Sequence, residues 1–195
     1  MEHVEWKPGN MLYPVPPVLV TCRYDGIDDI MTAAWTGTIC SDPPMCYVSI
    51  RKERFSHDLI ENSGCFAINL PCSALKRAVD YCGVKSGRDE NKFETMHLAA
   101  ENGSRLDLPI LTAAPVNIEL RVTDILRLGS HDMFLGKVEA VDIDPSLLDA
   151  GGRFHMEKAG LITYAHGTYY ELGKSIGTFG WTVRKPKKRV GKRRS

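Results

Sequence analysis

The chain has 195 residues, an ordinary globular composition and a net charge of +1, which suits one domain with a substantial hydrophobic core. No apolar run approaches the roughly 18 residues that a transmembrane helix needs. The polar segment 1–10 lacks the basic-then-apolar order of a secretion signal, so we expect a cytoplasmic protein without a membrane contact.

The net charge hides an asymmetry along the chain. Residues 184–195 hold eight Lys or Arg and no acid, whereas the rest of the chain holds 17 basic and 24 acidic residues. An acidic body argues against a nucleic-acid-binding surface. We therefore predict one domain over residues 1–183 and a basic, disordered tail over 184–195, because dense like charges keep a segment extended.

The first half of the chain predicts short strands around one helix. The expected strands cover residues 15–24, 31–40, 45–50 and 65–70, with a turn at Asp25-Gly26 and a break at residues 42–44. A helix is expected over 56–62, with Ser56 as its N-cap and Gly64 where it ends.

The second half continues in the same style. A second helix is expected over 73–82 and a charged loop over 83–93. Strands are expected over 115–128 and 133–143, paired through Gly129-Ser130, and over 161–165 and 168–172. Many short strands with few helices favour a mainly β fold, an antiparallel barrel with helical insertions.

Most chemical motifs are missing. The six cysteines form no C-x-x-C pair, which predicts free thiols. The six histidines have no ligand-like spacing, so we expect no metal site. Neither a G-x-G-x-x-G fingerprint nor a complete P-loop occurs.

One junction has the makings of a phosphate site. A strand ends at Ile50, Arg51 and two further basic residues follow, and a helix opens near Ser56. Helix N-termini offer free N–H groups, and an Arg can add a bidentate contact to a phosphate. The alternative is an ordinary capped helix beside solvated basic side chains, and on spacing alone this alternative is the better supported.

Longer motifs change that balance. The order Met31-Thr-Ala-Ala-Trp35, Asp42-Pro-Pro44, Arg51, Phe55-Ser56 and Phe66-Ala-Ile-Asn69 resembles the flavin reductase family, and flavoredoxin-like members in particular. Three later segments fit the same pattern: Ser86–Phe93, His131–Val138 and Tyr169–Gly173. The resemblance covers residues 11–182 and implies an antiparallel split β-barrel of the FMN-binding type.

The resemblance also implies roles. Thr32, Ala33, Ala34, Trp35 and Thr36 would run beside the flavin, where backbone N–H groups can tune its potential. Ser49, Ile50, Arg51 and Ser56 would hold the ribityl chain and phosphate. Arg88 and Lys92 would complete the phosphate site, lie across a dimer interface, or form a solvated loop. His131 is the candidate catalytic residue, approaching the flavin from the partner subunit, with a surface or core histidine as the alternative. Two departures stand out: Asp29 where Asn is common, and Ser130 where Asp often precedes the histidine.

These expectations lead to three candidate functions. The first is a homodimeric flavin reductase that passes hydride from NADH or NADPH to FMN, which needs no acid–base pair. The second is a flavoredoxin-type FMN electron carrier with a protein redox partner. The third is a non-catalytic barrel whose flavin site has decayed, against which the presence of Arg51 and Ser56 speaks.

Overall fold

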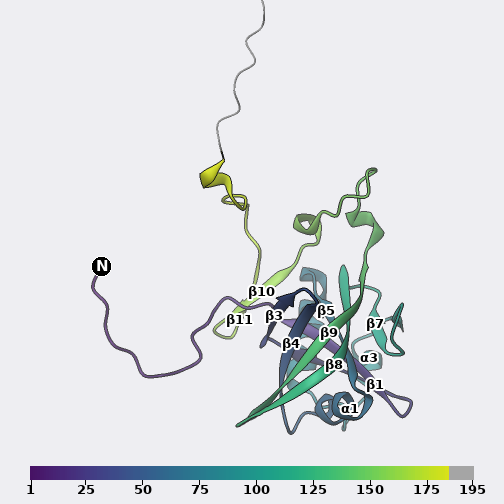
Figure 1. The fold of residues 1–195 in the computed structure, drawn as a ribbon. Coiled ribbons are helices and arrows are strands. Elements are labelled where there is room, and N and C mark those ends of the chain that lie inside the picture. Colours follow the sequence, from purple (N-terminus) through teal and green to yellow (C-terminus); the bar gives the residue numbers. More distant parts are fainter. Residues whose placement is uncertain (185–195) are drawn as a thin grey trace, which may run out of the picture.

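The structure is a computed structural model that describes residues 1–184; apart from Arg184, the predicted basic tail lies outside the described residues. Seven strands form one antiparallel sheet in the order β2-β1-β5-β8-β9-β4-β3 (Figure 1). Their bounds are β1 Val18–Tyr24, β2 Ile27–Ala33, β3 Thr36–Ser41, β4 Pro44–Arg51, β5 Cys65–Leu70, β8 Val116–Leu128 and β9 His131–Ile143. The mainly β, split-barrel prediction is confirmed.

The remaining elements are short. Two small hairpins pair β6 (Ala100–Asn102) with β7 (Pro109–Leu111) and β10 (Ile162–Ala165) with β11 (Thr168–Glu171). The helices are α1 (Phe55–Ser63), α2 (Lys76–Val84) and α3 (Lys92–Thr95), and single 3-10 turns cover Ser73–Leu75, Pro145–Leu147, Met156–Lys158 and Trp181–Val183. No helix among residues 1–184 is long and apolar enough to cross a bilayer.

The sheet closes on itself at Ala34-Trp35. β2 and β3 lie at opposite edges of the sheet, yet only these two residues join them. Two linking residues reach at most about 11 Å between Ala33 and Thr36, so the two edges must meet and the sheet must curl into a barrel. The single strand predicted over 31–40 is therefore wrong, because the chain leaves one edge and starts the other at this point.

Apolar side chains fill the barrel and cover its outer face. Val20, Phe66, Leu120 and Phe134 are fully buried inside the barrel, and the buried Ile60 of α1 belongs to the same cluster. A second cluster, made by Leu19, Ile30, Val79, Cys82, Leu111 and Ile162, packs α2 against the other face of β1 and β2. Because both faces of β1 are buried, its sequence is apolar throughout most of its length rather than alternating.

Several predicted boundaries hold. Asp25-Gly26 makes the β1–β2 turn with positive φ at both residues, as a two-residue hairpin requires. Gly64 ends α1 in the left-handed conformation. The β8–β9 hairpin turns at Gly129-Ser130 as expected. The N-cap of α1, however, is Arg54 rather than Ser56, because Phe55 already has helical geometry. The Ser56 hydroxyl donates to the Asp29 carboxylate instead of capping the helix. The strand pair β6–β7 and helix α3 are too short to have been predicted.

A buried carboxylate holds the 103–106 loop against the sheet. Glu119 of β8 is fully buried and accepts hydrogen bonds from the backbone N–H groups of Ser104 (2.6 Å), Arg105 (3.2 Å) and Leu106 (2.6 Å). Burial alone would raise the pKa of Glu119, but these donors hold it below its ordinary value of 4.5. The carboxylate therefore replaces the backbone acceptors that the loop lacks.

Replacing this carboxylate should cost more stability than any surface acid. Glu119→Ala leaves three loop N–H groups without their acceptor, each at a cost of about 1–3 kcal/mol, so we expect urea unfolding to show a total loss of at least about 3 kcal/mol. Glu171→Ala, which removes an exposed strand carboxylate, is the control and should change stability by less than about 0.5 kcal/mol. Equal losses in the two variants would contradict the anchoring role.

Candidate functional site

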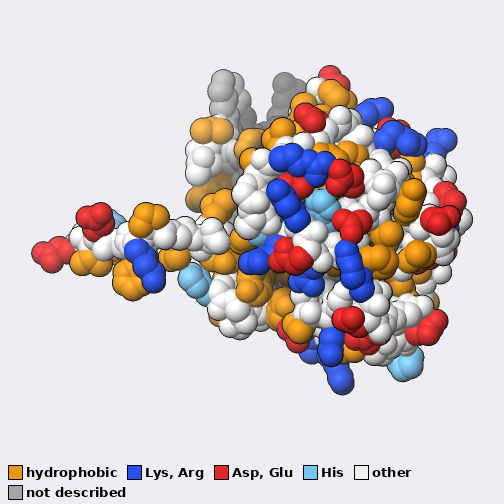
Figure 2. Space-filling view, turned by 90° about the horizontal axis from the view of Figure 1, so that it is seen from below, with side chains coloured by type: hydrophobic (Ala, Val, Ile, Leu, Met, Phe, Trp, Pro, Cys, Tyr) orange, Lys and Arg blue, Asp and Glu red, His pale blue; other side chains and the backbone are white. Residues whose placement is uncertain are grey.

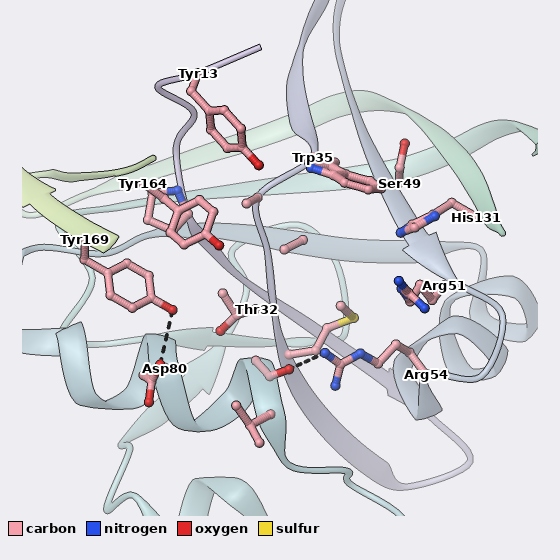
Figure 3. A pocket seen from close by; sticks show the side chains of 16 residues that line it. Tyr13, Thr32, Trp35, Ser49, Arg51, Arg54, Asp80, His131, Tyr164 and Tyr169 are labelled. Atoms are coloured by element: carbon pink, nitrogen blue, oxygen red, sulfur yellow. Dashed lines mark hydrogen bonds between the residues drawn. The ribbon is translucent and has the colours of Figure 1, made fainter. Parts of the chain in front are cut away.

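A cavity of about 360 Å³ lies at the seam where the barrel closes (Figure 3). We call it the first cavity. Its wall includes the β2–β3 junction with Thr32, Ala33, Ala34 and Trp35, and side chains from β4, β9, α2 and the β10–β11 hairpin complete it. A volume in this range is typical of a site for a small molecule or cofactor.

One end of the first cavity is basic. Arg51 closes β4 and faces His131 of β9 in register, and Arg54 follows in the β4–α1 turn. Arg51 has one ionic partner among the described residues, the exposed Glu53 at 3.2 Å. Arg54 donates to the carbonyl of Gly83 at the end of α2. Arg51 is therefore the cation best able to take an anionic ligand group.

His131 is set between a cation and an aromatic ring. Its ring centroid lies 4.4 Å from that of Trp35, and its Nδ1 is 2.9 Å from the hydroxyl of Ser130. Partial burial and the nearby Arg51 charge hold the pKa of His131 below its ordinary value of 6.5. This shift favours the neutral imidazole, which can donate one proton and accept another.

The other end is aromatic. Tyr13, Tyr164 and Tyr169 stand together there, with ring centroids 6.1 Å (Tyr13–Tyr164) and 5.4 Å (Tyr164–Tyr169) apart. Asp80 of α2 lies beside them, 3.5 Å from the Tyr169 hydroxyl. Burial, followed by the Asp80 charge, raises the pKa of Tyr169. Of the described residues that line this end, none is Lys or Arg, and the aromatic rings and the Asp80 carboxylate form its surface.

The wall between the two ends is narrow and offers free donors. Thr32 turns its hydroxyl away to the carbonyl of Val79, at 2.5 Å. The backbone N–H groups of Ala34 and Trp35 donate to no acceptor in the described part of the chain, whereas the Trp35 carbonyl accepts from Ser49 at 2.8 Å. Small side chains at 33 and 34 let a ligand approach this backbone closely.

The structure brings seven of the twelve predicted site residues together. The first cavity is lined by Thr32, Ala33, Ala34, Trp35, Ser49, Arg51 and His131. Thr36 lies on the other side of Trp35, in a neighbouring cavity. Ile50, Ser56, Arg88 and Lys92 do not line the first cavity, and their proposed contact with a flavin stays a prediction.

Ser56 and Lys92 are engaged with Asp29, the residue that departs from the family pattern. The Lys92 ammonium lies 3.1 Å from the Asp29 carboxylate, the Ser56 hydroxyl donates to the same group, and all three side chains are buried. Gly87 packs directly on Asp29, so closely that a Cβ at position 87 would overlap the carboxylate. The cluster fastens the 85–92 loop to β2 and α1.

Ile50 and Arg88 have structural contacts of their own. The Ile50 side chain is fully buried in the barrel core. Arg88 forms an ion pair with Asp58 at 2.6 Å and lies over the Phe55 ring, 5.0 Å from its centroid. Arg88 therefore braces the start of α1, and Ile50 packs in the core cluster that Phe55 of the same helix also contacts.

A buried acid also braces the basic end. Asp132, next to His131, accepts from Arg127 at 2.5 Å and lies 3.0 Å from His57 of α1 and 3.5 Å from the Lys52 ammonium. Burial alone would raise the pKa of Asp132, but Arg127 and His57 hold it at about 2. Lys52 is thus drawn to Asp132.

Several residues of the cavity wall were not among the predicted site residues. Arg54 was noted only as a neighbour of Arg51, and Tyr13, Asp80 and Tyr164 were not noted at all. Tyr13 and Tyr164 meet through the antiparallel bridge between Val15 and Tyr164, which joins segments about 150 residues apart. In the sequence, only the grouping of tyrosines at 164, 169 and 170 could have indicated a surface that binds a ring system.

Comparisons with known proteins agree on the family. Flavoredoxin of Desulfovibrio vulgaris (Miyazaki F) is 30% identical, with a TM-score of 0.86 over 94% of this chain and all of that one. An FMN-binding protein from Thermus thermophilus, solved with bound 1-cyclohex-2-enone, is 28% identical, with a TM-score of 0.77 over 91% of this chain and 99% of that one.

The sequence relatives are less informative. An uncharacterized protein of Aeropyrum pernix is 36% identical over 68% of this chain, and this match spans only about half (51%) of the relative. Residues 10–173 match the family described as flavin reductase like domain, which includes the seam, both arginines and the aromatic end. The chain therefore belongs to the flavin reductase like domain family.

Proposed function

We propose that this chain is an FMN-binding oxidoreductase that uses NADH or NADPH as its electron donor. The observation that carries the proposal is the first cavity itself, which pairs a basic end with an aromatic end across a wall of free backbone N–H groups. FMN has the matching parts: a phosphate, a flat ring system, and ring acceptors that need donors.

The residues present fit this cofactor. Arg51, assisted by Arg54 and Ser49, would hold the phosphate by charge-assisted hydrogen bonds. Thr32 to Trp35 would lie along the ribityl chain and ring edge, and Tyr164 and Tyr169 would shield the ring from water. Thr36 would lie on the far side of Trp35. The start of α1 would be held in shape by Ile50, Ser56, Arg88 and Lys92.

Bound FMN would supply the two-electron chemistry, by accepting a hydride from the nicotinamide. The chain's contribution is then position and electrostatics. His131, whose ring lies tilted against that of Trp35 and whose pKa is lowered, is placed to donate or accept a proton at the cavity. To test the proposal, the purified protein is loaded with FMN and NADH or NADPH is added without oxygen. Bleaching of the yellow flavin supports it, and no response to either donor contradicts it.

A second candidate function is electron transfer to or from a protein partner. Flavoredoxin, the comparison with the TM-score of 0.86, favours it. In that case the FMN-loaded protein would not be bleached by nicotinamide donors but would be reduced by a reduced redox protein.

Arg51→Ala should weaken FMN binding by about 1.5–3 kcal/mol, the range for a hydrogen bond to a charged group. The fold should survive, because the Arg51 side chain is more than half exposed (57%). Quenching of flavin fluorescence measures the affinity. Arg121→Ala, which removes an exposed arginine of β8 outside the cavity, is the matched control. An unchanged affinity in Arg51→Ala would move the phosphate site elsewhere.

The titration of His131 should report on Arg51. In the native protein we expect a titration midpoint below 6.5, because protonation would place a second positive charge in a partly buried site beside Arg51. Arg51→Ala should raise that midpoint. Histidine ring signals followed by NMR across the pH range give the value. A midpoint unmoved by Arg51→Ala would show that the two groups do not interact. Because the pKa of His131 is lower in the folded state than in the unfolded chain, the unfolded state binds the proton more readily. His131 therefore lowers the stability of the fold as the pH falls below the pKa of the unfolded chain.

We propose further that the working unit is a homodimer. Two extended arms leave the barrel, residues 1–8 and 172–184, and both carry exposed apolar side chains (Figures 1 and 2). Trp6 is 70% exposed and Phe179 fully so. A second copy of the chain would cover such arms most economically, since a symmetric interface uses the same patches twice.

Sedimentation equilibrium at micromolar concentration tests the dimer. We expect a dimer for the full chain and a weaker one for Trp6→Asp, because the exposed indole loses its burial, worth about 1.5–3 kcal/mol for a large apolar side chain. His3→Asp, a change at a polar position of the same arm, should leave the dimer intact. A monomer that still holds FMN would contradict the proposal.

A further inference from the structure

A second cavity, of about 490 Å³, lies on the other side of Trp35. One wall is the N-terminal segment from Gly9 to Tyr13, and the opposite wall comes from Thr36 and Tyr47 of the β3–β4 hairpin. Tyr13, Ala34 and Trp35 line both cavities. Ligands in the two cavities would therefore touch the same indole.

The two cavities differ in charge. The first has two arginines, a histidine and an aspartate in its wall, whereas none of the ten described residues lining the second is Asp, Glu, Lys, Arg or His. The Thr36 hydroxyl is already used, since it donates to the Tyr47 carbonyl at 2.5 Å. A nicotinamide dinucleotide could not place its pyrophosphate in the second cavity without leaving two charges unpaired.

The polar groups that remain suit a carbonyl. Within the described chain the hydroxyls of Tyr81 and Tyr169 have partners, but those of Tyr13 and Tyr47 have none. The Tyr47 ring is held in place by Gly37, where a Cβ would come within 3.1 Å of it. Met11 and Leu12 add apolar surface, so the site offers flat contacts and two hydroxyl donors.

We propose that the second cavity binds a neutral, planar conjugated carbonyl compound of the quinone class, as the electron acceptor. This rests on the proposed function, because the electrons come from FMN in the first cavity. The acceptor gains two electrons from the reduced flavin, which cross the shared Trp35 wall, and two protons from water and becomes a hydroquinone, while the flavin releases its protons and returns to its oxidised form. The shared Trp35 wall places donor and acceptor next to each other.

Binding to the FMN-loaded and the flavin-free protein tests the site directly. The probe is tetramethylbenzoquinone, whose substituted ring does not add thiols, compared with trimethylhydroxybenzoquinone, which has nearly the same shape but is an anion at neutral pH. By calorimetry we expect the neutral probe to bind at least tenfold more tightly. Leu12→Asp should weaken neutral-probe binding at least tenfold, because it brings a charge to the wall, and should leave FMN affinity unchanged. Val4→Asp, an equally exposed position of the N-terminal arm that lines neither cavity, should change neither affinity.

Three results would overturn the proposal. Equal affinity for the two probes would remove the selection against charge. Unchanged quinone binding in Leu12→Asp would place the quinone elsewhere. A loss of binding in Leu12→Asp that accompanies dissociation in sedimentation would make the cavity an interface between copies. If instead FMN fails to bind while the quinone behaves as expected, the proposed function and the electron transfer fail, but the quinone-binding site stands.

Discussion

The two-residue connection between β2 and β3 is the constraint on which the rest of the structure depends. It joins the two edge strands of a seven-stranded sheet, so the sheet has to curl until its edges meet. Among the described residues no full strand ladder closes the barrel at this seam, and the backbone N–H groups of Ala34 and Trp35 donate to no acceptor there. A fold that completed its hydrogen bonding here would have no room and no donors for a ligand.

The charged groups around the first cavity are mostly paired within the protein. Arg51 stays available because the other charged groups nearby are matched within the protein: Lys52 lies by Asp132, Lys92 by Asp29, and Arg88 by Asp58. Of these three pairs, only Lys92–Asp29 is buried on both sides, and an unpaired charge in such a place would be costly. The pairs behind the wall therefore keep the start of α1 in place without competing for an anion in the cavity.

The sequence predicted local structure better than the site. Cys65–Leu70, the Gly64 helix end and the β8–β9 hairpin follow from composition and turn residues, and the structure agrees. The break at Ala34-Trp35 could not be seen, because a small apolar stretch reads as one strand whether it crosses a seam or not. Ser56 could be placed at the start of a helix, but its partner Asp29 lies 27 residues earlier and meets it only through tertiary contacts. Arg51 and Trp35 were identified through motif order, whereas Tyr13 and Tyr164 reach the cavity through a single bridge between distant segments.

The N-terminal segment has an unusual position among the walls of the two cavities. It contributes half of the residues lining the second cavity, Gly9 to Tyr13, yet it precedes every strand of the barrel and takes no part in the core clusters. Substitutions at residues 9–12 can therefore remodel that cavity without disturbing the barrel, its closure or the basic end. A lineage of such proteins could exchange one small-molecule preference for another through a few changes near the start of the chain, at little cost in foldability.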